Sequence, residues 1–232
     1  MRRVYKQAVS AADAGQHRVL LDGKPLRSPA GGVVGLPNAA LAAAVAAEWQ
    51  AQGAEIDAGK LPLTRLACTV VDRVAADPPT LAQAIAAFAD TDLLCYRAEA
   101  PRALVERQQR LWQPLLDWAT LRFDAPLLAV PGVMHRPQPP AAVAALGAAV
   151  AAIADPWRLL ALHEVTTLTG SLVLGLALLE RHLDLDGVWC AAQLDEDFQA
   201  ERWGEDDEAA LRRAGLRADL AAAARLLDLL ER

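Results

Sequence analysis

The 232-residue sequence has few cysteines, no long apolar run and no surplus of basic residues. Its three cysteines are odd in number and lack the CxxC spacing, which excludes a disulfide scaffold and indicates a reducing compartment. The longest unbroken apolar candidates for a membrane span, 141–154 and 165–179, are shorter than the roughly 18–20 residues that cross a bilayer. We therefore expect no stable membrane insertion.

The charge balance excludes a second group of functions. Lysine and arginine together number 23 against 29 aspartates and glutamates, which gives a formal charge of −6 and a pI near 5.2. A strongly basic surface is the mark of nucleic-acid binding, so we expect no nucleic-acid partner. Arg2 and Arg3 are not followed by an apolar run, so no signal peptide is expected and the predicted location is cytoplasmic.

Motifs for catalysis and cofactor binding are absent from the sequence as well. His163 and Glu164 begin a zinc-protease pattern, but the second histidine it needs is replaced by Thr167. The Gly-Lys pair at 23–24 is followed by proline, and neither GxGxxG nor GxSxG occurs. The four histidines are scattered singly. We therefore expect no catalytic residue, no metal site and no cofactor.

Alanine is what the sequence has in abundance: 51 residues account for much of the 54% apolar content, while aromatic residues make up 5%. Alanine favours helix because its side chain loses no rotamer entropy.

The first 36 residues differ from the rest of the chain, since short apolar runs and an Asp22-Gly23 turn signal predict three or four antiparallel strands. Helical periodicity from Pro37 onward predicts helices at 38–53, 63–76, 81–89, 101–118, 141–154, 156–181, 187–202, 205–214 and 217–231.

These patterns predict an α+β protein. A small N-terminal antiparallel β-containing domain with one or two helices, residues 1–75, should precede a larger all-helical C-terminal domain, residues 76–232. The six tryptophans all lie on predicted helices or at their ends, which is typical of core residues and not of a cofactor cage. Trp49 shares a helical stripe with Leu41 and Val45, so we expect it to be largely buried.

One segment holds nearly all the net acidity. Residues 195–208 contain eight acids and one base, a charge of −7, which leaves +1 for the rest of the chain. A calcium loop would need glycine and glutamate where Ala200 and Asp206 stand. Two interpretations remain: a solvated helix face with Phe198 and Trp203 packed inward, or a docking patch for a basic partner surface with these aromatics as anchors.

Four blocks of residues occur in a characteristic order along the chain. The blocks are 36–38 leading to 48–53, then 61–67 with 72–73, then 91–97 with 113–114 and Trp118, and lastly 198–204. In this order and spacing they resemble a known family, the assembly chaperones of the ATP synthase alpha subunit. The resemblance covers nearly the whole chain, from about Val4 to Glu208.

The resemblance implies a β-rich N-terminal domain, a helical C-terminal domain and a non-enzymatic role. The chaperone would hold the free alpha subunit, its partner, until the beta subunit takes its place. The family's functional acidic residue lies in the block before Gln-x-x-x-Trp-Gly, where Glu196 is the best match. Asp195, Asp197, Glu201 and Trp203 complete the expected partner-binding set. The absence of a leading transit segment suggests a bacterial member, or a matrix protein if a eukaryotic chain has been trimmed.

Two rival hypotheses remain open. A small soluble enzyme of unknown class could use Glu164 or the acids of 195–208 as general acid or base, and it would need a concave pocket with a perturbed carboxylate. A generic scaffold would have no specific client. A free subunit exposes apolar interface that aggregates, and holding it requires no nucleotide hydrolysis, in keeping with the missing phosphate loop.

Overall fold

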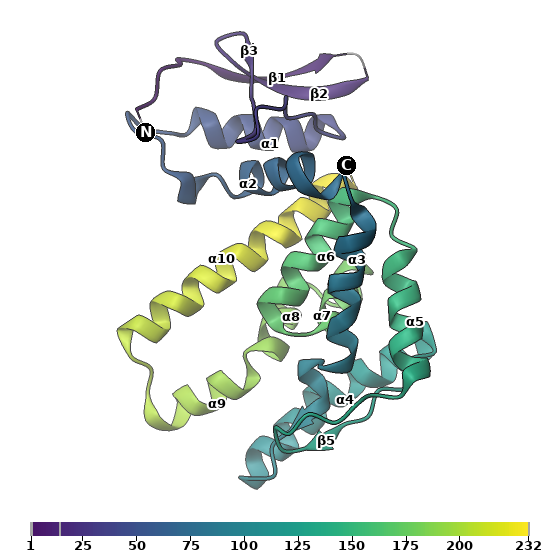
Figure 1. Cartoon of the computed structure of the whole chain (residues 1–232). Helices are drawn as coiled ribbons and strands as arrows, with labels where there is room; N and C mark the ends of the chain where they lie inside the picture. The colour runs from purple at the N-terminus through teal and green to yellow at the C-terminus, as the bar shows by residue number, and fades with distance from the viewer. Residues whose placement is uncertain (1, 14, 232) are drawn as a thin grey trace. The chain divides into compact units, whose positions relative to one another are not determined.

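The structure is a computed structural model that describes residues 2–13 and 15–231. The chain divides into two compact units, unit 1 with residues 1–78 and 224–232, and unit 2 with residues 79–223. Figure 1 shows the elements of each. The expected domain ranges, 1–75 and 76–232, differ from this division by assigning the end of the last helix to the helical part. That residues 1–75 and 76–232 are the two domains of the chain stays a prediction.

Unit 1 opens with a three-stranded antiparallel sheet in the order β1–β2–β3 (Figure 1). The strands are β1 (Ala8–Asp13), β2 (Gln16–Leu21) and β3 (Lys24–Pro25). Asp22 and Gly23 join β2 to β3 with φ values of 47° and 80°. Two successive left-handed residues are the conformation of a type I′ hairpin turn, which these two residue types favour. The predicted hairpin and the small N-terminal antiparallel sheet are therefore confirmed.

One helix packs on this sheet. α1 (Ala39–Gln50) contacts β1 and β2 and buries Leu41 and Val45 completely. Asn38 caps its N-terminus by accepting a 2.8 Å hydrogen bond from the amide of Leu41, as its sequence position predicts. The stretch 33–36, expected to add a strand, forms only isolated bridges among the residues of the structure, at Val33 and Leu36.

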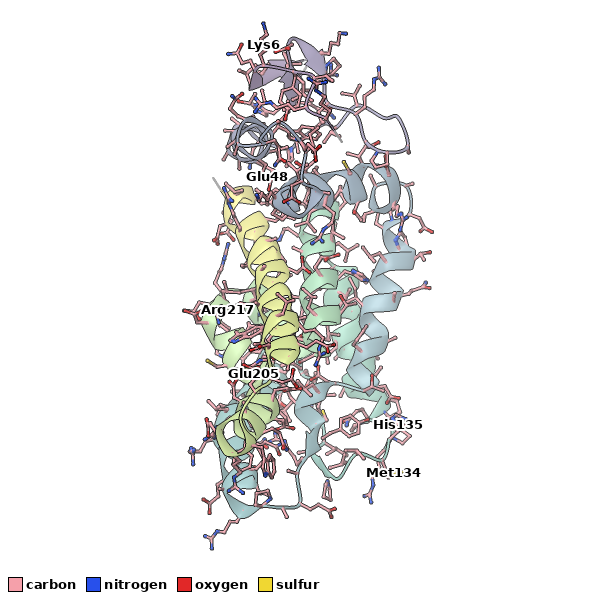
Figure 2. The ribbon with its side chains drawn as sticks, turned by 90° about the vertical axis from the view of Figure 1, so that its left-hand side faces the viewer. Lys6, Glu48, Met134, His135, Glu205 and Arg217 are labelled. Atoms are coloured by element: carbon pink, nitrogen blue, oxygen red, sulfur yellow. The ribbon has the colours of Figure 1, made fainter. Side chains whose placement is uncertain are left out.

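A buried carboxylate fixes the next helix to α1. α2 (Pro62–Thr69) continues into a π-helical turn, η2 (Val70–Val74), where the sequence predicts one regular helix. Glu48 of α1 accepts hydrogen bonds from the amides of Leu63 and Thr64, at 2.8 and 2.9 Å, and from the Thr64 hydroxyl at 2.8 Å. Glu48 is labelled in Figure 2. Its negative charge also complements the positive N-terminal end of α2.

Trp49 is mostly but not completely buried, in agreement with the expectation of a largely buried side chain. Its indole Nε1 donates to Thr64 Oγ1 at 3.1 Å, and its carbonyl accepts from the Tyr5 hydroxyl at 2.7 Å. The exposed part of Trp49 lines a cavity beside α2. Helical periodicity identifies the inward face of α1, whereas the cavity beside Trp49 depends on the residues of α2 that cover it.

Unit 2 is built around α7 (Leu172–Leu179), in which every residue is buried. Helices α4, α6 and α8 pack against it (Figure 1). The bounds of the other helices in or entering this unit are α3 (Pro78–Ala86), α4 (Arg102–Phe123), α5 (Pro140–Ala151), α6 (Pro156–Thr169), α8 (Leu185–Ala192), α9 (Leu194–Trp203) and α10 (Asp207–Leu230). The helical architecture expected after the sheet is confirmed.

Two long predicted helices are each broken in the structure. The helix expected over 156–181 ends at Gly170, whose φ of 69° is the left-handed C-cap conformation, and Ser171 then caps α7. The helix expected over 187–202 is interrupted at Gln193 between α8 and α9. The apolar pattern continues through both breaks, so helical periodicity does not indicate where each helix ends.

The opposite error occurs at the C-terminus. Separate helices were expected at 205–214 and 217–231, but α10 is continuous from Asp207 to Leu230. Gly215 lies inside it. A glycine costs a helix roughly 1 kcal/mol relative to alanine, which a long alanine-rich helix tolerates.

A buried aspartate joins two elements of unit 2. Asp92 is fully buried and accepts hydrogen bonds from the amides of Leu94 and Val173, both at 3.0 Å, and from the Ser171 hydroxyl at 2.8 Å. It thereby binds the 3-10 turn η4 (Leu93–Cys95) to the start of α7. Burial raises the pKa of Asp92 to about 6, although these hydrogen bonds oppose the shift.

The segment after η4 is extended. β4 (Tyr96–Arg97) pairs in parallel with β5 (Val130–Pro131) in a two-stranded sheet. The sequence left 93–96 open between helix and strand, and the structure contains both, a 3-10 turn followed by a strand. Within residues 2–13 and 15–231, no helix has the length and apolar character needed to cross a bilayer.

Candidate functional site

The acidic helix α9 follows α8 with only Gln193 between them and buries two side chains, Leu194 and Phe198, toward α4 and α8. Trp203, at the other end of the helix, is 72% exposed. The two aromatics of the segment therefore have different roles. Phe198 packs inward, as a solvated-face interpretation requires, whereas Trp203 is available to a partner.

Glu201 is fixed by an ion pair with the neighbouring helix. Its two carboxylate oxygens each accept a hydrogen bond from Arg107 of α4, both at 2.8 Å. This bidentate pair lowers the pKa of Glu201 and raises that of Arg107. The Arg107 guanidinium also lies 5.4 Å from the Phe198 ring centroid. The pair connects α9 to α4.

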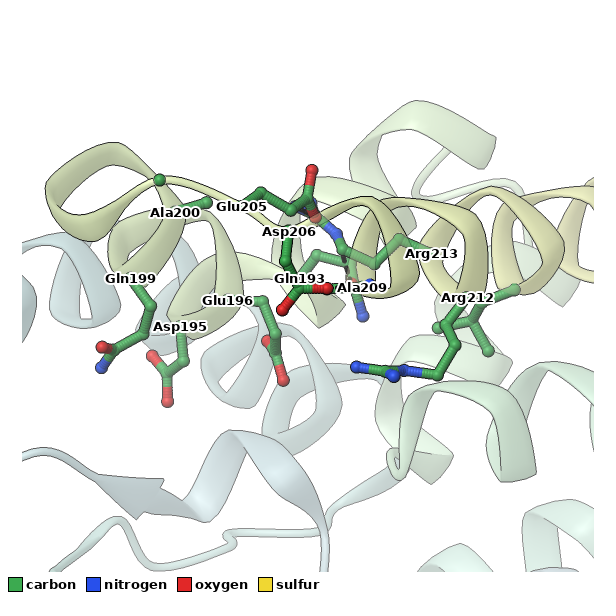
Figure 3. Close-up of a pocket in the computed structure, with 12 residues that line it drawn as sticks. Gln193, Asp195, Glu196, Gln199, Ala200, Glu205, Asp206, Ala209, Arg212 and Arg213 are labelled. Atoms are coloured by element: carbon green, nitrogen blue, oxygen red, sulfur yellow. Dashed lines mark hydrogen bonds and ion pairs between the residues drawn. The ribbon is translucent and has the colours of Figure 1, made fainter.

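Asp197 is held in a second ion-pair network. Arg213 of α10 pairs with Asp197 and donates to Glu205 at 2.9 Å and to the Gln193 side chain at 3.1 Å. Burial opposes the positive charge of Arg213, but the hydrogen bonds to Glu205 and Asp197 outweigh it and raise the pKa of the guanidinium. The network links α9 and α10 across the short turn that Gly204 begins (Figure 3).

Asp195 also has an internal partner. Its Oδ1 accepts a 2.8 Å hydrogen bond from Nε2 of Gln108, which is itself buried on α4. The Gln108 Oε1 accepts from the amide of Ala98 at 2.8 Å, so the amide side chain is held at both ends. Asp195 is thereby oriented by α4.

Glu196 is the exception among the acids of α9. It is exposed, and within the described part of the chain no group donates a hydrogen bond to it or forms an ion pair with it. Glu196 lines a hollow of about 580 Å³ together with Gln199 and Arg212. Figure 3 shows the residues of this hollow. We call this space the α9–α10 hollow, defined by Gln193, Glu196, Gln199, Glu205, Arg212 and Arg213.

The other charged groups of the α9–α10 hollow are compensated. Arg212 pairs with Glu208 at 2.8 Å, and Asp206 caps α10 by accepting from the amide of Ala209 at 2.7 Å. Together with the partners of Asp195, Glu205 and Arg213, this leaves Glu196 as an uncompensated carboxylate beside polar neighbours. Such an arrangement suits a basic side chain brought by a partner.

Arginines of α4 and α10 are the part of the site that sequence reasoning missed. Arg107, Arg212 and Arg213 carry no motif, and Arg107 lies 94 residues from its partner Glu201. Of the five predicted residues, Asp195, Asp197 and Glu201 were expected as partner contacts, and each has an internal partner in the structure. The Arg212-Arg213 pair close to the acidic run is a sequence signal for internal ion pairs, but the sequence does not indicate which acids form them.

The part of the chain that the structure covers contains no group of three or more His, Cys, Asp or Glu side chains able to hold a metal ion. The Nδ1 atom of His163 lies 3.8 Å from Oε1 of Glu164, and both residues are partly buried.

Comparison with known proteins first gives the class of this protein, which is that of a chaperone. The family model that matches residues 2–120 is described as the ATP12 chaperone protein. The chain therefore belongs to the ATP12 chaperone family, a family of ATP synthase assembly, as the four sequence blocks indicated.

Relatives from three organisms match over most of the chain. Atp12 from Paracoccus denitrificans has a crystal structure that is 42% identical, with a TM-score of 0.91, and the match covers 98% of this chain and 97% of that one. A protein from Agrobacterium tumefaciens of known structure is 44% identical, with a TM-score of 0.93, over 99% of this chain and 86% of that one. The mitochondrial protein atp12 of Schizosaccharomyces pombe is 24% identical over 90% of this chain and 75% of its own length.

Proposed function

We propose that this protein binds the free alpha subunit of the ATP synthase catalytic head and prevents its aggregation until the beta subunit replaces the chaperone. Membership of the ATP12 family supports this function, and the proposed role is that of a non-enzymatic holder. The proposed location is the compartment in which the head assembles, the bacterial cytoplasm or the mitochondrial matrix.

The observation that carries the assignment of the site is the uncompensated Glu196. Neighbouring acids are bound to Arg107, Gln108 and Arg213, so a partner would have to break existing pairs to use them. Glu196 requires no such exchange. We therefore assign the client's contact to Glu196 and its hollow, with Trp203 as an aromatic contact on the same face of α9 two turns on.

Paired acids have a different proposed role in this function. Asp195, Asp197 and Glu201 fix α9 against α4 and α10, so Glu196 is presented on a helix that does not have to become ordered on binding. Rigid presentation lowers the entropic cost of association. These three residues thus act as positioning residues for the contact.

The test is the charge reversal Glu196→Lys. Loss of one member of an interfacial charge pair costs ~2–5 kcal/mol, so the affinity for the alpha subunit should fall at least 30-fold. The variant should keep its melting temperature, because Glu196 is exposed and makes no contact to lose. The measurement is light scattering of the alpha subunit during dilution from denaturant, with and without the chaperone.

Glu99→Lys is the matched control. Glu99 is also exposed and in unit 2, and the substitution makes the same change in net charge at a residue that does not line the α9–α10 hollow. It should suppress aggregation as the parent does. If Glu196→Lys protects the alpha subunit equally well, the site assignment fails. If the parent itself gives no protection, the proposed function fails.

A further inference from the structure

Unit 1 contains a second concave site, distinct from the acidic helix. A cavity of about 600 Å³ lies beside α2 and η2. Its long wall is formed at helical spacing by residues from Leu61 to Arg73, and its other side by the loop 27–29 and Trp49. We call it the α2 groove and define it by Arg27, Trp49, Leu61, Arg65, Cys68 and Arg73.

The dimensions of the α2 groove suit a segment of extended chain. Twelve helical steps from Leu61 to Arg73 span about 18 Å at ~1.5 Å per residue. An extended peptide advances ~3.3 Å per residue, so about five residues would occupy this length. The π-helical turn that carries Asp72 and Arg73 widens the helix at one end, and such turns occur frequently at functional sites.

The chemistry of the α2 groove is an apolar floor with a basic rim. Trp49, Leu61 and Cys68 supply apolar surface, whereas Arg27, Arg65 and Arg73 are exposed arginines along the edges. The carboxylate that lines it, Asp72, accepts hydrogen bonds from the Ser28 hydroxyl and the amide of Ala30, so it is engaged in holding the loop.

This basic rim contrasts with the rest of the protein. Unit 1 carries a formal charge of +2 and unit 2 one of −8. Tryptophan and arginine are also the residue types most enriched at the energetic centres of protein interfaces. Complementarity therefore requires a ligand that is acidic and that offers an apolar side chain.

We propose that the α2 groove binds an extended acidic segment of a partner protein, which places an apolar side chain against Trp49 and its carboxylates beside Arg27, Arg65 and Arg73. Acidic and apolar side chains should alternate along the segment, because successive side chains of an extended chain point to opposite sides. Carboxylates beside guanidinium groups form charge-assisted hydrogen bonds. This site is independent of the alpha-subunit contact proposed for Glu196.

The three cysteines provide a direct test on the parent protein. Cys68 lies in the α2 groove and is half-buried, Cys190 is exposed in unit 2, and Cys95 is fully buried. An occupied groove should slow alkylation of Cys68 by N-ethylmaleimide and leave Cys190 unchanged. Burial, and secondarily the nearby Asp72 charge, raises the pKa of the Cys68 thiol, so labelling is best run at about pH 8.5.

The probe is a fluorescein-labelled ten-residue peptide that alternates Asp or Glu with Leu or Phe. Expected results are at least fivefold slower alkylation of Cys68 and saturable fluorescence anisotropy. A peptide with Lys at the acidic positions is the ligand control. Arg73→Glu should weaken acidic-peptide binding at least tenfold. Arg110→Glu, an exposed arginine in unit 2 with the same charge change, should not alter it.

Three outcomes would overturn the proposal. Unchanged alkylation of Cys68 at saturating acidic peptide would show that the α2 groove is not the binding site. Equal protection by the lysine peptide would rule out recognition by charge. Equal protection by N-acetyl-leucine at the same concentration would identify a site for small apolar carboxylates in place of a protein segment. Each outcome is measured on folded parent protein.

Discussion

Replacing Asp92 with alanine should destabilise unit 2 more than any other single truncation of a charged side chain there. The Asp92 carboxylate accepts from three donors, the amides of Leu94 and Val173 and the hydroxyl of Ser171, at 2.8–3.0 Å in a fully buried position. Alanine offers no acceptor. The two amides are at helix starts and have no intrahelical acceptor in their first turns.

The magnitude follows from the donors left unpaired. Each buried donor that loses its partner costs ~1–3 kcal/mol, and three neighbouring donors relax together, so we expect a total of about 3–5 kcal/mol. The removed desolvation penalty of the carboxylate offsets part of this loss. A typical domain has ~5–15 kcal/mol of stability, so Asp92→Ala should leave unit 2 marginally folded.

Asp92→Asn gives a finer test through pH. The folded-state pKa of about 6 lies above the ordinary value of 3.8 for an aspartate, so the folded protein binds this proton more tightly than the unfolded chain does. The stabilisation from this proton is complete below about pH 4 and is lost as pH rises through 6. Between pH 5 and pH 7 the parent should lose ~1 kcal/mol that the asparagine variant does not lose.

The assay is urea unfolding followed by tryptophan fluorescence. Five of the six tryptophans belong to unit 2, so the signal reports mainly on that unit. A loss below about 1 kcal/mol for Asp92→Ala would show that the three donors find other acceptors, and it would refute the cost assigned to unpaired groups. A parent and an asparagine variant with parallel pH profiles would refute the raised pKa.

Two further changes test the packing of each unit. Glu48→Ala should lower the free energy of unfolding of unit 1 by about 2–4 kcal/mol in urea, because the amides of Leu63 and Thr64 and the Thr64 hydroxyl lose a buried acceptor. The control is Glu55→Ala, at an exposed glutamate of unit 1, which should change this free energy by less than about 0.5 kcal/mol. Gly175→Ala should destabilise unit 2 by ~1–3 kcal/mol and lower its melting temperature, because a Cβ there would lie 2.6 Å from Thr166 Oγ1 and 2.8 Å from Leu162 Cδ1. The control is Gly215→Ala in α10, which should be neutral or stabilising because no heavy atom lies within 4 Å of the added Cβ.

Features that depend on neighbouring residues in the sequence could be predicted. The Asp22-Gly23 turn and the Asn38 cap each follow from the conformational preferences of one or two residues. Glu196 could be placed on an exposed helix face in the same way, since periodicity alone puts Leu194 and Phe198 on the opposite side. These preferences operate whatever the rest of the chain does.

Features that depend on tertiary contacts could not be predicted. Gly170 ends a helix while Gly215 continues one, and the difference lies in the residues after each glycine. Ser171 caps a new helix, and its acceptor Asp92 comes from 79 residues earlier in the chain. The α2 groove likewise requires the loop at 27–29, Trp49 and α2 to meet. No spacing within any one of these segments indicates the other two.

The internal pairing of the acidic helix would make the proposed client contact selective. If all the acids of α9 were unpaired, any basic surface would be attracted, and release would require many new ion pairs to be broken together. Arg107 and Arg213 neutralise Glu201 and Asp197 in advance, so a partner gains one new charge contact, at Glu196. We infer that a single charge contact keeps the affinity contributed by charge small, so that a subunit with a larger, apolar interface can displace the chaperone. In the proposed function the chaperone has to lose to the proper partner of its client, and the arginines of α4 and α10 would supply that limit.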